Sequence, residues 1–212
     1  RGKDMVTLIP ESRWDWSTMF NARRANRGTS VSKWGCFFEG IEMFDAAFFK
    51  ISPREARTMD PGHRMLLECS WEASENSGLD PQSLEVEGRI ASVCVGISVS
   101  DYVEKLEMKD MMYRHTSSYS SAAAGRIACS SSLVSLITGS EDVETGKSDL
   151  SICLGVQTMT TPGWHIVTSQ SGMLSDDGRC KTFDASANGY VRAEGCGGVI
   201  LASGSIGEVY RR

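Results

Sequence analysis

Two short runs that are apolar almost throughout constrain the fold of this chain more than any other feature. They cover residues 90–97 (IASVCVGI) and residues 149–156 (DLSICLGV). Runs of this length are too short to cross a bilayer, which requires about 20 apolar residues. They are typical of β-strands that other layers cover on both faces. The sequence therefore predicts two buried strands at these positions.

Signals for helix starts lie before these runs. Ser52 and Asp60 each precede a proline, and Glu55 lies three residues after Ser52. A Ser or Asp N-cap followed by Pro is typical of the first turn of a helix, and Glu55 completes a capping box. After Pro61 the apolar residues recur with a period of 3.6, and Gly78 is the expected end of that helix. Because strands alternate with helices, the sequence predicts the α/β class.

The two ends of the chain carry weaker patterns. Residues 1–35 are mixed, and we expect a loop with a short helix in which Trp14 and Trp16 are packing anchors. After residue 156 we expect a loop and a helix that reaches residue 174. Residues 189–201 resemble a further strand, whose glycines leave room for a neighbouring backbone.

Composition excludes several classes of function. The 212 residues carry a net charge of -5 and show no basic stripe, which argues against a nucleic-acid-binding protein. Seven cysteines are scattered without a Cys-x-x-Cys pair, a pattern that favours reduced thiols in the cytoplasm over a disulfide framework or a zinc site. No signal peptide is visible. Since the chain starts with Arg and stops directly after an apolar run, we expect a fragment of a longer protein.

The candidate nucleophile is Cys129. It is followed by three serines and then by apolar residues at helical spacing, from Leu133 onwards. A cysteine in the first turn of a helix lies near unpaired backbone N–H groups and the positive end of the helix dipole, which favour the nucleophilic thiolate. The alternative is a buried structural cysteine beside a serine N-cap. The motif alone leaves both interpretations open.

Further motifs accompany Cys129 in a fixed order along most of the chain. Together they resemble the ketosynthase domain of modular polyketide synthases, in the β-ketoacyl synthase (thiolase-like) family. The matching runs are residues 44–56 (FDAAFFKISPREA), 59–61 (MDP), 95–97 (VGI), 123–127 (AAGRI), 128–134 (ACSSSLV), 172–175 (GMLS), 177–181 (DGRCK), 183–187 (FDASA) and 189–195 (GYVRAEG).

The resemblance implies a fold and an activity. The fold would be thiolase-like, with two similar halves in α-β-α-β-α layers, and this chain would supply the N-terminal half: a loop and helix region over 1–35, then residues 36–212. The activity would be decarboxylative Claisen condensation of acyl thioesters. Cys129 would accept the acyl chain from the 4'-phosphopantetheine arm of an acyl carrier protein, backbone N–H groups would stabilise the oxyanion, and two histidines would assist decarboxylation. The family acts as a homodimer and uses no metal and no bound cofactor.

The chain departs from the family pattern in its histidines and before Cys129. His63, His115 and His165 stand in no family histidine motif, since those motifs lie beyond residue 212, and we expect all three to be solvated side chains. Residue 127 runs directly into residue 128, whereas the family has a turn and a strand there, roughly fifteen residues. We therefore predict that one core strand is missing before Cys129. In that case residues 122–137 are able to merge into one helix, with Cys129 in its interior.

Other residues have two interpretations. Asp184 and Glu194 offer an acid–base pair, but we expect structural carboxylates. Arg126 and Arg192 are candidates for contacts with a carrier protein, although solvated or ion-paired side chains are more common. Residues 164–173 would line the acyl pocket of a ketosynthase, or form plain core.

Three functions follow from these observations. The first is a ketosynthase fragment that carries its acyl group on Cys129. The second is a catalytically incomplete fragment that binds a carrier protein or another ketosynthase. The third, a cysteine hydrolase, requires a histidine beside Cys129.

Overall fold

The structure is a computed structural model that describes residues 2–23, 26–80, 88–98, 100–106 and 128–204. The chain divides into two compact units. Unit 1 comprises residues 1–41, 101–105 and 158–194, and unit 2 comprises residues 42–100, 106–157 and 195–212. Within the described ranges, no helix has both the length and the apolar character needed to span a membrane.

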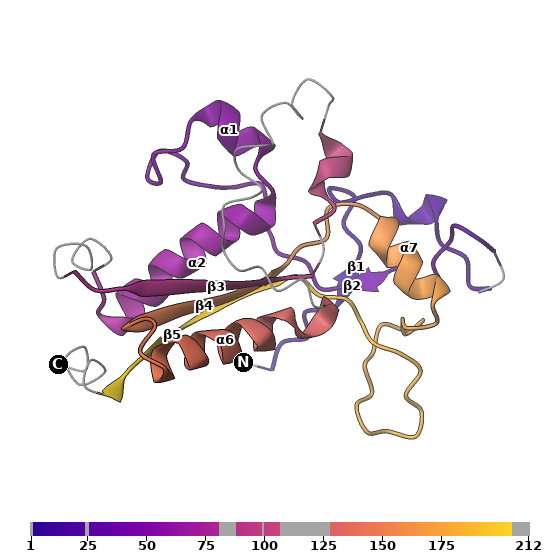
Figure 1. The fold of residues 1–212 in the computed structure, drawn as a ribbon. Coiled ribbons are helices and arrows are strands. Elements are labelled where there is room, and N and C mark those ends of the chain that lie inside the picture. Colours follow the sequence, from indigo (N-terminus) through magenta and orange to yellow (C-terminus); the bar gives the residue numbers. More distant parts are fainter. Residues whose placement is uncertain (1, 24–25, 81–87, 99, 107–127, 205–212) are drawn as a thin grey trace. The chain divides into compact units, whose positions relative to one another are not determined.

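Unit 2 is built around a three-stranded sheet in the order β3-β4-β5 (Figure 1). The strands are β3 (Ala91–Ile97), β4 (Leu150–Gln157) and β5 (Gly195–Ala202). β3 runs parallel to β4, and β5 runs antiparallel to it. Both strands predicted from apolar runs are therefore confirmed, and they are neighbours in the sheet.

Two helices precede β3, as their capping signals predict. They are α1 (Pro53–Thr58) and α2 (Pro61–Ser77). The Ser52 hydroxyl accepts a hydrogen bond from the Glu55 N–H at 3.2 Å, and the Asp60 carboxylate accepts one from the Gly62 N–H at 2.7 Å. Gly78 ends α2 in the left-handed conformation, with φ of 73°.

Helices cover both faces of this sheet. α2 packs on β4 and β5, and α6 (Ser131–Glu144) packs on the opposite face, over β3 and β4 (Figure 1). On the α2 side the buried core consists of Leu66, Val95, Leu154 and Val156. The α/β class is thus confirmed, in three layers. Because α2 lies over β4 and β5, it does not cover β3 completely on this face, and Val93 of β3 is 44% exposed.

The predicted strand over 189–201 begins later than expected. β5 starts at Gly195, where the chain passes from unit 1 to unit 2, and only residues 195–202 lie beside β4. Close packing holds at two glycines of the predicted strand: a Cβ on Gly189 would lie 2.5 Å from the backbone of Leu174, and a Cβ on Gly198 would lie 2.7 Å from the Leu154 side chain. A Cβ on Gly195 or Gly197 would meet nothing within 4 Å.

Unit 1 has little regular structure and its own apolar core. Ile9, Trp14, Met19 and Met159 form this core, and Trp16 packs against it, so both tryptophans are anchors as predicted. The regular elements are the strands β1 (Thr7–Leu8) and β2 (Trp34–Gly35), the 3-10 turns η1 (Trp16–Thr18) and η2 (Tyr102–Lys105), and the helix α7 (Gly163–Gln170).

Some expectations fall outside the described residues. The helix segment 122–127, Arg126 and His115 lie within residues 107–127, and the strand predicted to be missing would follow residue 127 directly. The missing strand therefore stays a prediction.

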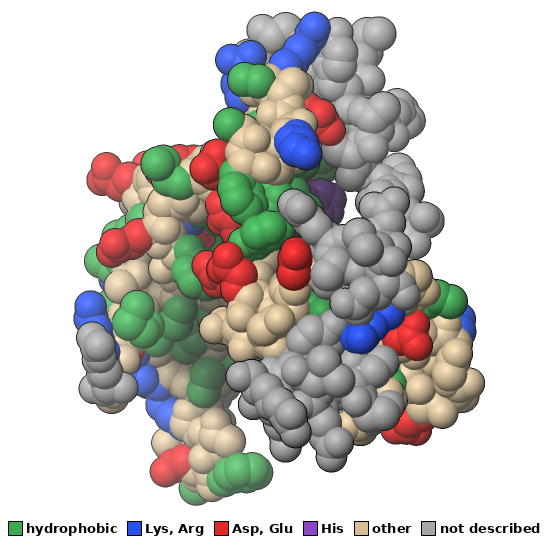
Figure 2. All heavy atoms as spheres, turned by 90° about the vertical axis from the view of Figure 1, so that its left-hand side faces the viewer, with side chains coloured by type: hydrophobic (Ala, Val, Ile, Leu, Met, Phe, Trp, Pro, Cys, Tyr) green, Lys and Arg blue, Asp and Glu red, His purple; other side chains and the backbone are tan. Residues whose placement is uncertain are grey.

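Side chains of different kinds are mixed on the face that Figure 2 shows. In the view of Figure 2, the described hydrophobic, acidic and basic side chains alternate, and lysines and arginines do not gather into one stripe on this face.

Candidate functional site

Cys129 lies at the head of α6. It belongs to the 3-10 turn η3 (Ala128–Ser130), and α6 itself begins at Ser131. Its side chain is exposed, so the alternative of a buried structural cysteine is wrong. Ser130 occupies the N-cap position but makes no capping hydrogen bond with its side chain. Cys129 therefore precedes the regular turns of α6 instead of lying within them.

Two glycines let the first turn of α6 lie directly on the sheet. Gly96 of β3 and Gly155 of β4 are register partners. A Cβ on Gly96 would overlap the backbone carbonyl of Ser131, and a Cβ on Gly155 would lie 2.8 Å from the Cβ of Ser132. Real Cβ atoms essentially never approach so closely. The two glycines thus determine where the first turn of α6, which directly follows Cys129, lies on the sheet.

The rest of α6 turns its small residues toward the sheet and its large apolar residues outward. Its buried residues are Ser131, Ser135, Gly139 and Asp142. The Ser135 hydroxyl donates a hydrogen bond to the Leu154 carbonyl of β4 at 3.1 Å. On the outer face, Leu133, Leu136 and Ile137 are 64%, 36% and 57% exposed. This apolar row starts four residues after Cys129, one turn along the helix.

His165 is buried in unit 1, and the expectation of a solvated side chain is wrong for it. It lies on α7 with no exposed surface, and its Nε2 is 3.0 Å from the Ser32 carbonyl oxygen. Burial lowers the pKa of His165 to about 4, so the ring is neutral near pH 7. His63 is half-buried on α2. A general base must reach the proton that it removes, and an enclosed ring such as His165 lacks this access.

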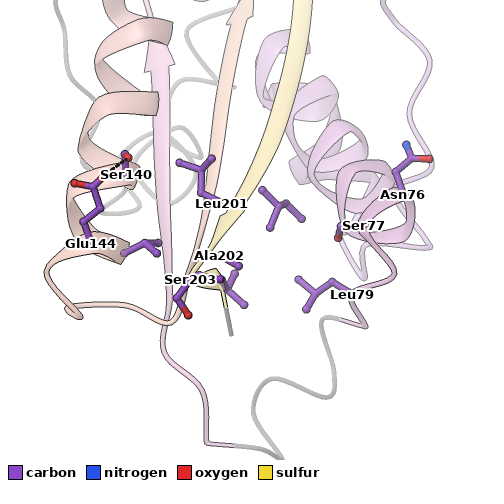
Figure 3. Close-up of a pocket in the computed structure, with 12 residues that line it drawn as sticks. Asn76, Ser77, Leu79, Ser140, Glu144, Leu201, Ala202 and Ser203 are labelled. Atoms are coloured by element: carbon purple, nitrogen blue, oxygen red, sulfur yellow. Dashed lines mark hydrogen bonds between the residues drawn. The ribbon is translucent and has the colours of Figure 1, made fainter. Parts of the chain in front are cut away.

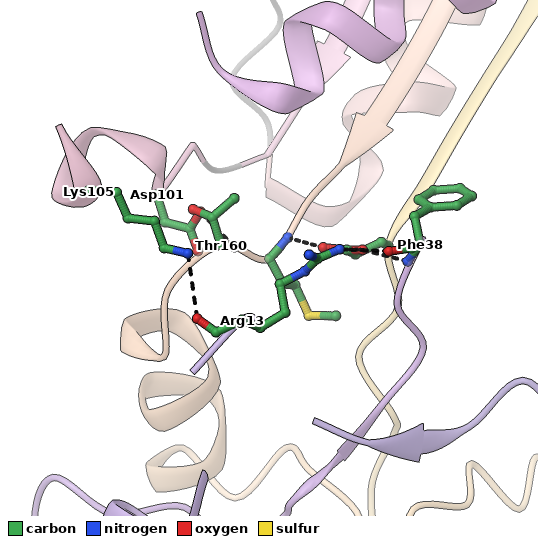
Figure 4. Close-up of polar contacts among 7 residues, drawn as sticks. Arg13, Phe38, Asp101, Lys105 and Thr160 are labelled. Carbon is green, nitrogen blue, oxygen red and sulfur yellow. Dashed lines mark hydrogen bonds and ion pairs between the residues drawn. The ribbon is translucent and has the colours of Figure 1, made fainter. Parts of the chain in front are cut away.

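Glu194 is a structural carboxylate, as predicted. Its Oε2 lies 3.0 Å from Arg13 Nη2 and accepts a hydrogen bond from the Phe38 N–H at 2.7 Å, while its Oε1 accepts one from the Met159 N–H (Figure 4). Asp184 accepts hydrogen bonds from the Ser186 N–H and hydroxyl, as a turn carboxylate does. Glu194 thus joins segments that are distant in sequence, whereas Asp184 bonds within its own turn.

A second buried carboxylate in Figure 4 was not identified from the sequence. Asp101 is 3% exposed and accepts hydrogen bonds from the backbone N–H groups and hydroxyls of Thr160 and Thr161. Arg192 is half-buried, and burial lowers its pKa. Its Nη1 is enclosed and has no hydrogen-bond partner among the described residues, so this end of Arg192 is not solvated. The spacing of residues in the sequence does not indicate that Asp101 and Arg192 are buried.

The segment 164–173 is not plain core. Trp164, Val167 and Met173 are 40%, 49% and 50% exposed, while His165 and Ser169 are buried. Trp164 and Val167 of α7 thus present apolar surface outward, as does Met173 after the helix. A role in lining an acyl pocket stays a prediction.

A cavity of about 790 Å³ lies at the other end of α6 from Cys129 (Figure 3). The 14 residues of α6 span about 21 Å, so the cavity is remote from the nucleophile. It is lined by the ends of α2, α6, β4 and β5: Asn76, Ser77, Leu79, Ser140, Val143, Glu144, Leu150, Ile200, Leu201, Ala202, Ser203 and Gly204. In the part of the chain that the structure describes, no group of three His, Cys, Asp or Glu side chains is arranged to hold a metal ion.

Comparison with known proteins identifies relatives over nearly the whole chain. Residues 1–205 match the family "Beta-ketoacyl synthase, N-terminal domain". The chain is 38% identical to a phenolphthiocerol/phthiocerol polyketide synthase of Mycobacterium tuberculosis, covering 94% of this chain and 12% of that protein. It is also 38% identical to a mycocerosic acid synthase-like polyketide synthase of Mycolicibacterium smegmatis, covering 92% of this chain and 10% of that protein.

Solved structures agree with these relatives. An oxazolomycin ketosynthase domain of Streptomyces albus superimposes with a TM-score of 0.85 and 31% identity, over 98% of this chain and 40% of that one. The ketosynthase from module 6 of the bacillaene synthase of Bacillus subtilis superimposes with a TM-score of 0.80 and 29% identity, over 97% of this chain and 36% of that one. The chain thus spans about a tenth of the curated relatives and about two fifths of the solved domains.

Proposed function

This chain belongs to the β-ketoacyl synthase family, and on that premise we propose that Cys129 accepts an acyl group from a carrier-bound thioester. The observation that carries the proposal is the place of Cys129: an exposed thiol directly before α6, whose first turn packs on Gly96 and Gly155. A helix head offers unpaired backbone N–H groups, which suit the negative charge that develops on the oxygen during acyl transfer.

The proposed step is a transthioesterification. The Cys129 thiolate attacks the carbonyl carbon of the donor thioester, and a new C–S bond forms. Negative charge develops on the carbonyl oxygen, where N–H groups at a helix head would stabilise it. The intermediate then breaks the C–S bond to the phosphopantetheine sulfur, which leaves as a thiolate and takes a proton from solvent. The reaction consumes no cofactor.

The larger activity is also a proposal. We propose that the chain forms the N-terminal half of a thiolase-like ketosynthase, with residues 1–35 before the half formed by 36–212. The complete protein would condense acyl units by decarboxylative Claisen chemistry as a homodimer in the cytoplasm, with an acyl carrier protein as partner. Support comes from the relatives, which are polyketide synthases several times longer than this chain. The buried, neutral His165 is not suited to the histidine steps of that reaction.

Acyl transfer is tested by mass spectrometry. The folded chain is incubated with an acyl-pantetheine thioester, and its intact mass and peptide map are measured. We expect one acyl adduct on Cys129, and none on the Cys129→Ala variant. Cys180 is also exposed, so Cys180→Ala is the matched control and should keep the adduct. A folded wild-type chain that stays unacylated, or is acylated equally on Cys180, would refute the proposal.

A specific observation also favours a non-catalytic binding role. The apolar row Leu133, Leu136 and Ile137 is exposed on α6. Such a row suits burial against another ketosynthase polypeptide. Sedimentation of wild type, Cys129→Ala and Ile137→Asp tests this role. Association that survives Cys129→Ala and is lost in Ile137→Asp would support it, and a strictly monomeric wild type would remove it.

A further inference from the structure

Cys69 and Cys196 face each other between α2 and β5. Both are half-buried, and both pack against the cluster formed by Leu66, Val95, Leu154 and Val156. Cys69 is also among the groups that raise the pKa of Cys196. The two side chains therefore belong to one small cluster although the cysteines lie 127 positions apart in the sequence.

The geometry around Gly198 shows that the Cys69 sulfur lies close to β5, near Cys196. Gly198 lies two residues after Cys196 and hence on the same face of β5. A Cβ on Gly198 would lie 3.3 Å from Cys69 Sγ. Because Gly198 has no side chain, α2 approaches β5 closely, and the Cys69 sulfur reaches the strand beside Cys196.

We propose that Cys69 and Cys196 are a modification site, at which a small-molecule disulfide such as oxidised glutathione forms a reversible cross-link between α2 and β5. This proposal is independent of acyl transfer, because it does not involve Cys129. The Cys69 thiolate attacks one sulfur of oxidised glutathione, whose S–S bond breaks and releases one glutathione thiolate. Cys196 loses its proton to solvent and attacks the Cys69 sulfur, which releases the second glutathione. Two protein thiols are oxidised, and one glutathione disulfide is reduced to two thiols.

The attack of Cys196 on the Cys69 sulfur determines the pH at which the experiment is carried out. Burial, the neighbouring Cys69 and the Glu72 carboxylate raise the pKa of Cys196 to about 12. The attacking form is the thiolate, so closure of the disulfide accelerates as the pH rises from 7 to 9. Oxidation is therefore carried out at pH 8.5.

The other cysteines provide internal controls. Cys129 and Cys180 are exposed, so they should carry glutathione after oxidation and show that the oxidant has acted. Cys94 and Cys153 are register partners on neighbouring strands but are each only 3% exposed. They should stay reduced in the folded protein, because the oxidant has no access to them.

The test maps disulfides in the full chain after incubation with oxidised glutathione. Peptides separated without reductant should contain a Cys69–Cys196 cross-link that dithiothreitol removes. Because the cross-link restricts the unfolded chain, the oxidised protein should melt about 5–10 °C higher than the reduced protein. Cys69→Ser and Cys196→Ser should each lack both the cross-link and the increase in melting temperature, whereas Cys180→Ser should keep both.

The wild-type map decides the matter even where a variant fails to fold. A folded protein that is glutathionylated on Cys129 and Cys180 but lacks the Cys69–Cys196 peptide would overturn the proposal. So would a stable glutathione adduct on Cys69 with Cys196 still reduced, since the two sulfurs would then be too far apart to close.

Discussion

Arg13 and Glu194 form a buried ion pair across 181 residues of sequence: Arg13 Nη2 lies 3.0 Å from Glu194 Oε2, with side chains 6% and 0% exposed. The same carboxylate accepts the N–H groups of Phe38 and Met159. Three segments of unit 1 are thus held by one side chain. A buried ion pair adds little to the free energy of unfolding compared with apolar residues in the same place. Removal of one partner, however, leaves a buried charge without compensation.

We therefore predict that Glu194→Ala lowers the free energy of unfolding by about 3–5 kcal/mol. Glu194→Gln should cost less, because its amide oxygen still accepts a hydrogen bond. Urea denaturation followed by circular dichroism measures both. Asp184→Ala, which removes an exposed turn carboxylate, is the control and should cost about 1 kcal/mol or less. A Glu194→Ala protein as stable as that control would contradict the assigned role.

The close contact between Gly155 of β4 and Ser132 of α6 leads to a second prediction. Gly155→Ala should destabilise the fold by about 1–3 kcal/mol, because the new methyl group overlaps Ser132. It should also slow acylation of Cys129 by about tenfold or more, since the turn that carries the thiol must move. Stopped acylation reactions and urea denaturation measure the two effects.

Gly197→Ala is the matched control for this experiment. Gly197 lies in the same row of the sheet, opposite Gly155, but a Cβ there meets nothing within 4 Å. It should leave both acylation and stability close to wild type. Equal effects of the two substitutions would show that the contact with Ser132 does not position Cys129.

The buried His165 predicts a loss of stability in acid. Its pKa is about 4 in the folded protein and 6.5 ordinarily, so between these pH values the unfolded chain binds the extra proton. The contribution of the neutral His165 to the free energy of unfolding is fully present above pH 6.5. It falls by about 3 kcal/mol as the pH drops to 4. His165→Gln should flatten this part of the curve, as urea denaturation at pH 4.5, 5.5 and 7 measures.

His63→Gln serves as the control for this series, because His63 lies elsewhere, on α2. It should keep the acid loss of the wild type. The interpretation would fail if His165→Gln showed the same pH dependence as wild type and His63→Gln removed it.

Exposure of the thiols predicts an order of alkylation. Iodoacetamide should modify Cys129 and Cys180 first, because both side chains are exposed. Cys94 and Cys153 should react last, since each is 3% exposed and burial also raises the pKa of Cys153. Timed quenching with peptide mapping gives the order, and addition of urea should abolish the differences. Protection of Cys129 in the folded chain would conflict with its proposed access to a thioester.

The local elements of unit 2 could be predicted from the sequence. The starts of α1 and α2 depend on Ser52 and Asp60, whose side chains bond N–H groups two or three residues ahead. Such signals need no other part of the chain. The apolar runs likewise placed β3 and β4, and the motif around Cys129 correctly indicated a helix beginning at that point.

The site and its surroundings could be predicted only in part. The spacing of Leu133, Leu136 and Ile137 predicts a helix, but not that these residues face outward while Ser131, Ser135 and Gly139 face the sheet. Small residues at that face allow close approach to β3 and β4, which is a property of the packed pair and not of the helix alone.

The sequence by itself thus determined the α/β class, the helix caps, the family and the position of Cys129 before a helix. Only the tertiary structure decided which side chains are buried: His165 and Glu194 look like ordinary polar residues until Ser32 and Arg13 are brought against them. It also decided that β5 begins at Gly195, where pairing with β4 starts. The physical reason is the distance along the chain over which each interaction acts. Capping and periodicity act over three or four residues, whereas burial and ion pairing depend on segments that meet only after the chain has folded.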